Sequence, residues 1–180
     1  MGKATGDSFH LETIGELHAV ATHPFVPFSV VRLQQSPTDA ETVLTVELRD
    51  IQQGVTEERP FRLFWDSESV PPLPLAIQDN PLTEWAALGV ACAVIWRDAG
   101  LRLHAVAAEG DRVDYWVMQG DQEFGLEVSG TTGANLEARH REKVQQLRDN
   151  PYRSDGSVVV VGFTTRRVIF SFNRFDEGAP

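Results

Sequence analysis

The sequence predicts a mixed α/β (α+β) fold with a mixed central sheet, preceded by a small β-rich extension. Two observations predict it. From residue 81 onward, the hydrophobic pattern indicates a helix, three strands, a helix and two further strands. Before that point, "VPPLPLAIQDNP" carries four prolines in twelve residues, which excludes a regular helix and marks a boundary. We therefore expect an extension at residues 1–75 and a core domain at residues 76–180, since 180 residues suffice for one ordinary domain with an addition.

The extension contains three segments that alternate between apolar and polar residues and are rich in Val, Leu and Phe. These segments are "SVVRLQ", "ETVLTVELRD" and "RPFRLFW". The stretch "QSPTDA" between the first two has the composition of a loop. We expect three strands that form a small sheet.

The first helix of the core begins after a strong start signal. Asn80 is a good N-cap and Pro81 suits the first helical position, so the helix is expected from Pro81 to about Arg97, ending before Gly100. Its sequence is apolar almost all round, which predicts a buried helix. The single cysteine, Cys92, lies in this helix and is expected to be buried and inert.

Three strands are expected next, from "LRLHAVAAE", "RVDYWVMQ" and "FGLEVSG". The segment "ANLEARHREKVQQLRDN" then predicts an amphipathic helix that is capped near Asn135 and ends near Asn150. Two strands follow, "SVVVVGF" and "RVIFSF"; the first is continuously apolar, as is typical of a central strand covered on both faces. The apolar stripe of the helix consists of Leu136, His140, Val144 and Leu147.

The charge balance limits the possible partners. The net charge is −10 and the pI about 4.9, which argues against a protein that coats nucleic acid by charge alone. Basic residues are concentrated late, with eight Lys and Arg against six Asp and Glu after residue 133. The start lacks the apolar core of a secretory signal, and the longest apolar run, "WAALGVACAVIW", is too short to cross a bilayer. With one cysteine, we expect a cytoplasmic protein without a membrane anchor.

Two acids fall at unusual positions in "DRVDYWVMQGDQEFGLEVSG", residues 111–130. If Gly120 and Asp121 form the two-residue tip of a hairpin, the numbers of directly opposed residues sum to 241, and Asp114 lies opposite Glu127. Opposed residues project from the same face, where two like charges are unfavourable. Either acid taken alone would as readily face solvent, but the pair predicts a shared site.

A divalent cation would neutralise the acidic pair. Mg²⁺ prefers carboxylate oxygens and retains waters, so Asp114, Glu127 and the backbone carbonyl of Val128 suit it. The same register places Arg112 opposite Ser129, beside the acids.

A third acid lies on the buried helix. The residues four and seven positions after Glu84 are Leu88 and Ala91, so the carboxylate of Glu84 lies on an apolar face and needs a partner. Glu84 could alternatively complement the dipole at the start of its helix.

The order of elements, with an acid in the second core strand and "E-x-S" in the third, resembles the PD-(D/E)XK nuclease superfamily, which includes restriction endonucleases and Holliday junction resolvases. The resemblance covers residues 80–172. It implies a restriction endonuclease-like αβββαβ core and hydrolysis of phosphodiester bonds with Mg²⁺ or Mn²⁺. It also implies metal ligation by Asp114 and Glu127, completed by Glu84.

The sequence departs from that family at one catalytic position. Ser129 stands where a lysine is expected, and a hydroxyl cannot supply the positive charge that stabilises a pentavalent phosphate. The family tolerates relocation of this lysine to the following helix, where Lys143 and Arg139 share a face. Lys143 is the best substitute and Arg112 the second, although charges on a helix are commonly a solvated face.

The resemblance therefore predicts a metal-dependent nuclease, with DNA a more suitable substrate than RNA, in a prokaryotic restriction, repair or defence system. The catalytic residues would be Asp114, Glu127 and Lys143. The alternative is an inactive nuclease-fold subunit that binds protein or nucleic acid within a larger assembly or a homodimer. An acidic binding module unrelated to nucleases is a third possibility. The residues expected to contact nucleic acid are Arg112, Ser129 and Arg139.

Overall fold

The computed structural model describes residues 8–50, 52–68, 77–111, 113–150 and 155–175. They form one mixed eight-stranded sheet with the strand order β1-β3-β2-β8-β7-β6-β5-β4. The strands are β1 (Ser8–His10), β2 (Glu41–Asp50), β3 (Val55–Phe64), β4 (Arg102–Val106), β5 (Tyr115–Gln119), β6 (Gln122–Thr131), β7 (Gly156–Gly162) and β8 (Arg167–Asn173). The α-helices are α1 (Ile14–Leu17), α2 (Val26–Leu33), α3 (Asp79–Ala99) and α4 (Leu136–Arg148), with 3₁₀ turns at Leu11–Thr13 and His23–Phe25. The mixed α/β class is therefore confirmed.

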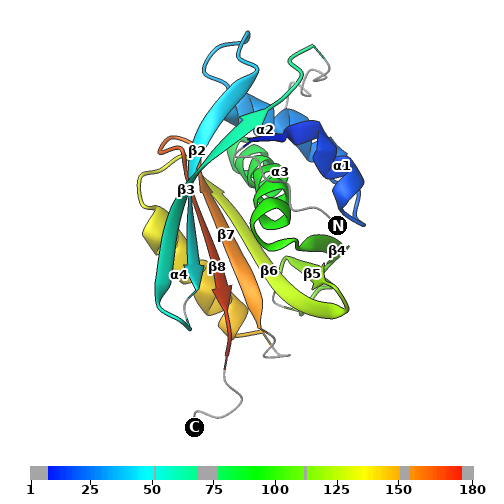
Figure 1. Ribbon diagram of the computed structural model, residues 1–180, viewed down its shortest axis with the longest axis vertical. Helices are drawn as coiled ribbons and strands as arrows, with labels where there is room; N and C mark the ends of the chain where they lie inside the picture. The colour runs from blue at the N-terminus through cyan, green and yellow to red at the C-terminus, as the bar shows by residue number, and fades with distance from the viewer. Residues whose placement is uncertain (1–7, 51, 69–76, 112, 151–154, 176–180) are drawn as a thin grey trace.

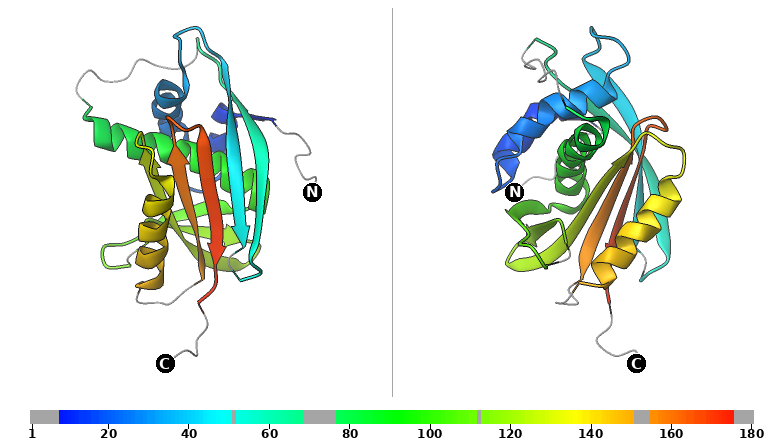
Figure 2. Two further views of the ribbon diagram at one scale, coloured as in Figure 1. Left: turned by 90° about the vertical axis from the view of Figure 1, so that its left-hand side faces the viewer. Right: turned by 180° about the vertical axis from the view of Figure 1, so that it is seen from behind.

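The sheet curves around α3, with α1 and α2 outside that helix and α4 on the opposite face (Figures 1 and 2). The larger hydrophobic core lies on the α3 side, where residues 86–95 are all buried. A smaller core fills the space under α4 and includes Leu136, Leu147 and Ile169. Along the part of the chain that the structure describes, no helix has both the length and the hydropathy needed to cross a bilayer.

The N-terminal segment differs from the expectation of three strands. The strands at residues 41–50 and 59–65 are confirmed as β2 and β3, but "SVVRLQ" lies mainly in helix α2. The physical reason is that Val26, Val30 and Leu33 recur at helical spacing and are buried, while Pro27 suits the first turn of a helix. Ser29 fixes α2 against α3 by donating to the carbonyl of Ala86 at 2.8 Å.

The N-terminal strands also do not form a separate small sheet. β2 pairs antiparallel with β3 and parallel with β8, through pairs that include Thr45↔Arg167 and Asp50↔Phe172. Residues from both ends of the chain thus share one set of backbone hydrogen bonds.

Helix α3 begins at Asp79, with Gln78 as its N-cap, so the expectation that Asn80 caps the helix is wrong. Pro81 is tolerated because the first N–H groups of a helix lack an intrahelical partner. The expected end is confirmed: Gly100 has φ 64°, a left-handed conformation that glycine adopts without strain. Cys92 is fully buried as expected, and burial raises the pKa of its thiol.

The hairpin register is confirmed. Tyr115 pairs with Leu126 and Gln119 pairs with Gln122, so opposed residue numbers sum to 241. Gly120 has φ 60°, which a type II′ turn requires at this position. Asp114 immediately precedes β5, and its N–H donates to the carbonyl of Leu126 at 3.2 Å.

The crossover from β6 through α4 to β7 makes those two strands parallel. Every residue of β7 is buried, as the continuous apolar run predicts. Asn135 caps α4 by accepting from the N–H of Ala138 at 3.0 Å. The predicted core position of His140 is confirmed, since it is buried with Nε2 2.7 Å from the Ser171 hydroxyl.

Candidate active site

Three elements bring the predicted acids and lysine together beside β6. Glu127 on β6 is 2% exposed, Asp114 lies just before β5, and Lys143 reaches them from the middle of α4. Together they line a cavity of about 420 Å³, which also includes Val113, Gln146 and Asp149.

A single ammonium group contacts both acids. Lys143 Nζ lies 2.7 Å from Glu127 Oε2 and 3.3 Å from Asp114 Oδ2. The same Asp114 oxygen accepts a hydrogen bond of 2.9 Å from the N–H of Val128. The like charges that the hairpin register brings face to face are thus balanced by a cation from another element.

Burial and charge shift the protonation of this group. Burial, and then the negative charge of Asp114, raise the pKa of Glu127 from 4.5 to about 7, although Lys143 acts in the opposite direction. Burial alone would lower the pKa of Lys143, but the charges of Asp114 and Glu127 raise it above its ordinary value. Lys143 is therefore positively charged at neutral pH, while Glu127 titrates in the physiological range.

Glu84 belongs to an adjacent cluster. Its Oε1 accepts from the Ser129 hydroxyl at 3.1 Å and from Arg139 Nη2 at 3.2 Å, and its Oε2 accepts from the Gly130 N–H at 3.1 Å. Arg139 Nε also donates to the Ser129 hydroxyl at 2.8 Å, and Arg139 Nη1 to Glu142 at 3.0 Å. The expectation that Glu84 has partners is confirmed, but its side chain is 41% exposed and is not buried on the apolar face of α3.

The two clusters share the wall of a second cavity. Its volume is about 240 Å³, and its lining includes Glu84, Asp114 and Lys143. Among the residues that the structure describes, however, no three His, Cys, Asp or Glu side chains are grouped to hold a metal ion. Glu84 is thus a neighbour of the acidic pair and is engaged with Ser129 and Arg139. Arg112 lies outside the described residues.

The donor types of the acidic pair suit a hard divalent cation. Asp114 and Glu127 offer carboxylate oxygens from adjacent segments, and Mg²⁺ prefers such ligands while keeping several waters. The ammonium of Lys143 occupies the position from which a positive charge neutralises both acids. The side chain of Asp114 is 37% exposed, which leaves an approach from solvent.

The apolar part of the site was not predicted from the sequence. Trp85, Leu88 and Tyr115 line the same 240 Å³ cavity as Asp114 and Lys143. A signal for Trp85 was present, because a large aromatic residue directly follows Glu84 near the start of the helix.

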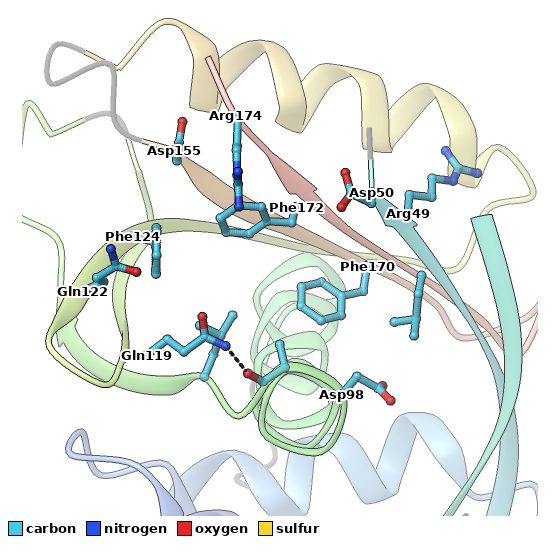
Figure 3. A pocket seen from close by; sticks show the side chains of 13 residues that line it. Arg49, Asp50, Asp98, Gln119, Gln122, Phe124, Asp155, Phe170, Phe172 and Arg174 are labelled. Atoms are coloured by element: carbon cyan, nitrogen blue, oxygen red, sulfur yellow. Dashed lines mark hydrogen bonds between the residues drawn. The ribbon is translucent and has the colours of Figure 1, made fainter. Parts of the chain in front are cut away.

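A larger cavity of about 570 Å³ lies at the C-terminal end of α3, between that helix and strands β2, β5, β6 and β8 (Figure 3). Phe124, Phe170 and Phe172 line it, and the Arg174 guanidinium lies 5.7 Å from the ring centre of Phe172. This cavity was also not anticipated from the sequence. It shares no lining residue with the two cavities beside Asp114.

Comparison of the chain with protein-family models, curated proteins and solved structures finds no match.

Proposed function

We propose that this protein is a metal-dependent phosphodiesterase that hydrolyses DNA, with a restriction endonuclease-like core formed by α3, β4, β5, β6, α4 and β7. The observation that carries the proposal is the contact of Lys143 with both Asp114 and Glu127. These three residues come from separate elements, and they supply two hard ligands and one cation although Ser129 occupies the position of the expected lysine.

In this proposal Asp114 and Glu127 hold Mg²⁺ or Mn²⁺, which supplies Lewis-acid stabilisation of charge on the phosphate. Lys143 provides a fixed positive charge beside the same oxygens, the contribution that electrostatic catalysis requires. Arg139 contacts the nucleic-acid backbone. Glu84 positions Arg139 and the Ser129 hydroxyl through the bonds described above.

The topology also supports the proposal. A helix, an antiparallel three-stranded meander, a second helix and a parallel strand follow one another as α3, β4, β5, β6, α4 and β7. The acids lie where the second and third strands of that meander meet. The only cysteine is reduced and buried, which suits a cytoplasmic restriction, repair or defence protein.

A second candidate function is that of an inactive subunit in a larger assembly or homodimer, with the cluster serving to stabilise the fold. One observation favours it: Lys143 and Arg139 are both ion-paired with acids of the same chain. Because acids of the same chain already neutralise both cations, these ion pairs form without substrate or metal.

Plasmid nicking combined with metal-dependent thermal stabilisation separates the two functions. We expect Mg²⁺ or Mn²⁺ to raise the melting temperature and to permit nicking of supercoiled DNA, and both effects to vanish in Asp114→Ala and Glu127→Ala. Glu123→Ala is the matched control, since Glu123 is an exposed acid on the same strand as Glu127. Stabilisation without nicking would favour the inactive subunit, and the absence of both effects would overturn the nuclease proposal.

A further inference from the structure

The cavity that joins the two charged clusters has one uncharged, largely apolar wall. Trp85, Leu88 and Tyr115 form this wall, and Asp114 and Lys143 line the same cavity. A site that handled a phosphodiester group alone would have no use for such a wall.

Trp85 is presented to solvent and held in place. Its exposed fraction is 40%, whereas the residues that follow it in α3, residues 86–95, are all buried. The ring of Phe28 on α2 packs against Trp85, with the ring centres 5.0 Å apart and the planes tilted by 55°. Trp85 is therefore a partly exposed aromatic ring that packs against Phe28.

On this basis, and resting on the proposed function, we infer that Trp85 stacks an unpaired base of DNA next to the phosphodiester group that lies at Asp114 and Lys143. A flat aromatic ring binds any nucleobase through its π face. A cavity of about 240 Å³ admits a single planar group, whereas the bases of a duplex are enclosed in their own stack. The substrate class is thus single-stranded DNA, or duplex DNA with an unpaired nucleotide.

The net charge of the protein also favours DNA with an unpaired base as the substrate. The net charge is −10, and the two cations of the site, Arg139 and Lys143, are each paired with acids. Recognition by phosphate contacts alone would therefore be weak. Stacking on Trp85 supplies affinity that does not depend on counterion release.

The test is the binding of a fluorescently labelled single-stranded oligodeoxynucleotide and of its duplex to the full-length chain, measured by fluorescence anisotropy. We expect Trp85→Ala to weaken binding of the single strand by about 5- to 150-fold, the range for one stacked base, and to leave duplex binding unchanged. Trp85→Phe should retain affinity within about 3-fold, because it keeps an aromatic face.

A second measurement leaves the protein unaltered. A series of oligonucleotides is prepared, each with one abasic position. One of them should bind the wild type more weakly than the intact strand does, by the same factor as the Trp85→Ala substitution. Trp85→Ala should bind that oligonucleotide and the intact strand equally. Phe172→Ala, in the cavity of Figure 3, is the matched aromatic control and should bind like the wild type.

Equal binding by Trp85→Ala and the wild type would overturn the inference, as would no measurable binding of the single strand to the wild type. A loss confined to Phe172→Ala would also overturn it, by placing the strand in the other cavity. Binding through Trp85 without any hydrolysis of DNA would overturn the proposed function alone, and hydrolysis without dependence on Trp85 would overturn this inference alone.

Discussion

Replacing Lys143 with Met removes the ammonium group that lies 2.7 Å from Glu127 and 3.3 Å from Asp114, while keeping a side chain of similar length. The side chain of Glu127 is only 3% exposed, so water compensates poorly for the lost partner. The Asp114 side chain is 37% exposed and is screened by solvent, so most of the effect comes from Glu127.

The sign of the pH dependence follows from the pKa of Glu127. It is raised from 4.5 to about 7, so the stabilisation from this group is present at low pH and is lost as pH rises through about 7. Lys143 acts to lower that pKa, so in Lys143→Met the pKa rises further and the loss extends to higher pH. At about pH 8.5 we expect the free energy of unfolding to fall by about 3 kcal/mol, the cost of a buried charge without its partner. At about pH 5.5, where Glu127 is protonated, the loss should be about 1 kcal/mol, the value of one hydrogen bond.

Urea unfolding of the wild type and Lys143→Met at both pH values measures this difference. Arg141→Met is the matched control, because Arg141 lies on the exposed side of the same helix. Added Mg²⁺ should stabilise Lys143→Met more than the wild type, because the ion then binds the acidic pair without competing with an ammonium group. Cleavage of DNA should be lost in this variant.

A loss of stability that is equal at both pH values would refute this reasoning, because it would show that Glu127 does not titrate near neutrality. The same effect in Arg141→Met would mean that the charge of the helix, rather than the contact with Glu127, is responsible. Equal stabilisation of the wild type and Lys143→Met by Mg²⁺ would show that the ammonium group does not compete with the ion.

Two further predictions follow from the same region. The charge of Asp114 raises the pKa of Glu127, so Asp114→Asn should move the titration of Glu127 to lower pH. NMR of the Glu127 carboxyl carbon measures the midpoint of this titration. An unchanged midpoint would contradict the arrangement of the two acids. Gly130→Ala should lower the free energy of unfolding by about 1–3 kcal/mol in thermal denaturation, because a Cβ at Gly130 would lie 2.5 Å from the carbonyl oxygen of Thr83 on α3. A melting temperature equal to that of the wild type would show that β6 and α3 can separate at no cost.

The part of the fold that sequence reasoning recovered is the part set by local signals. The Gly120-Asp121 tip fixes the register of the hairpin, and the register places Asp114 opposite Glu127. The spacing of apolar residues likewise predicts the buried stripe of α4, and Lys143, next to Val144 of that stripe, reaches Glu127 on β6. The candidate site follows from these two local patterns.

The remaining features depend on contacts between distant segments. The parallel pairing of β2 with β8 joins residues more than a hundred positions apart, and no local pattern specifies it. The sequence predicts a strand in place of helix α2 because Val30 and Val31 favour extended structure, but packing against α3 overrides that preference. The bond between Glu84 and Ser129 could not be predicted either, because it depends on how closely β6 approaches α3 at Gly130.

The pairing of β2 with β8 has a consequence for any attempt to express the C-terminal half of the chain by itself. Without residues 8–64, the N–H and C=O groups of β8 between Arg167 and Phe172 would face water along an open edge. Such an edge is a template for a strand from another molecule. A fragment that begins near residue 75 should therefore aggregate or assemble through β8. In the whole chain, β2 occupies this edge and prevents β8 from pairing with another molecule.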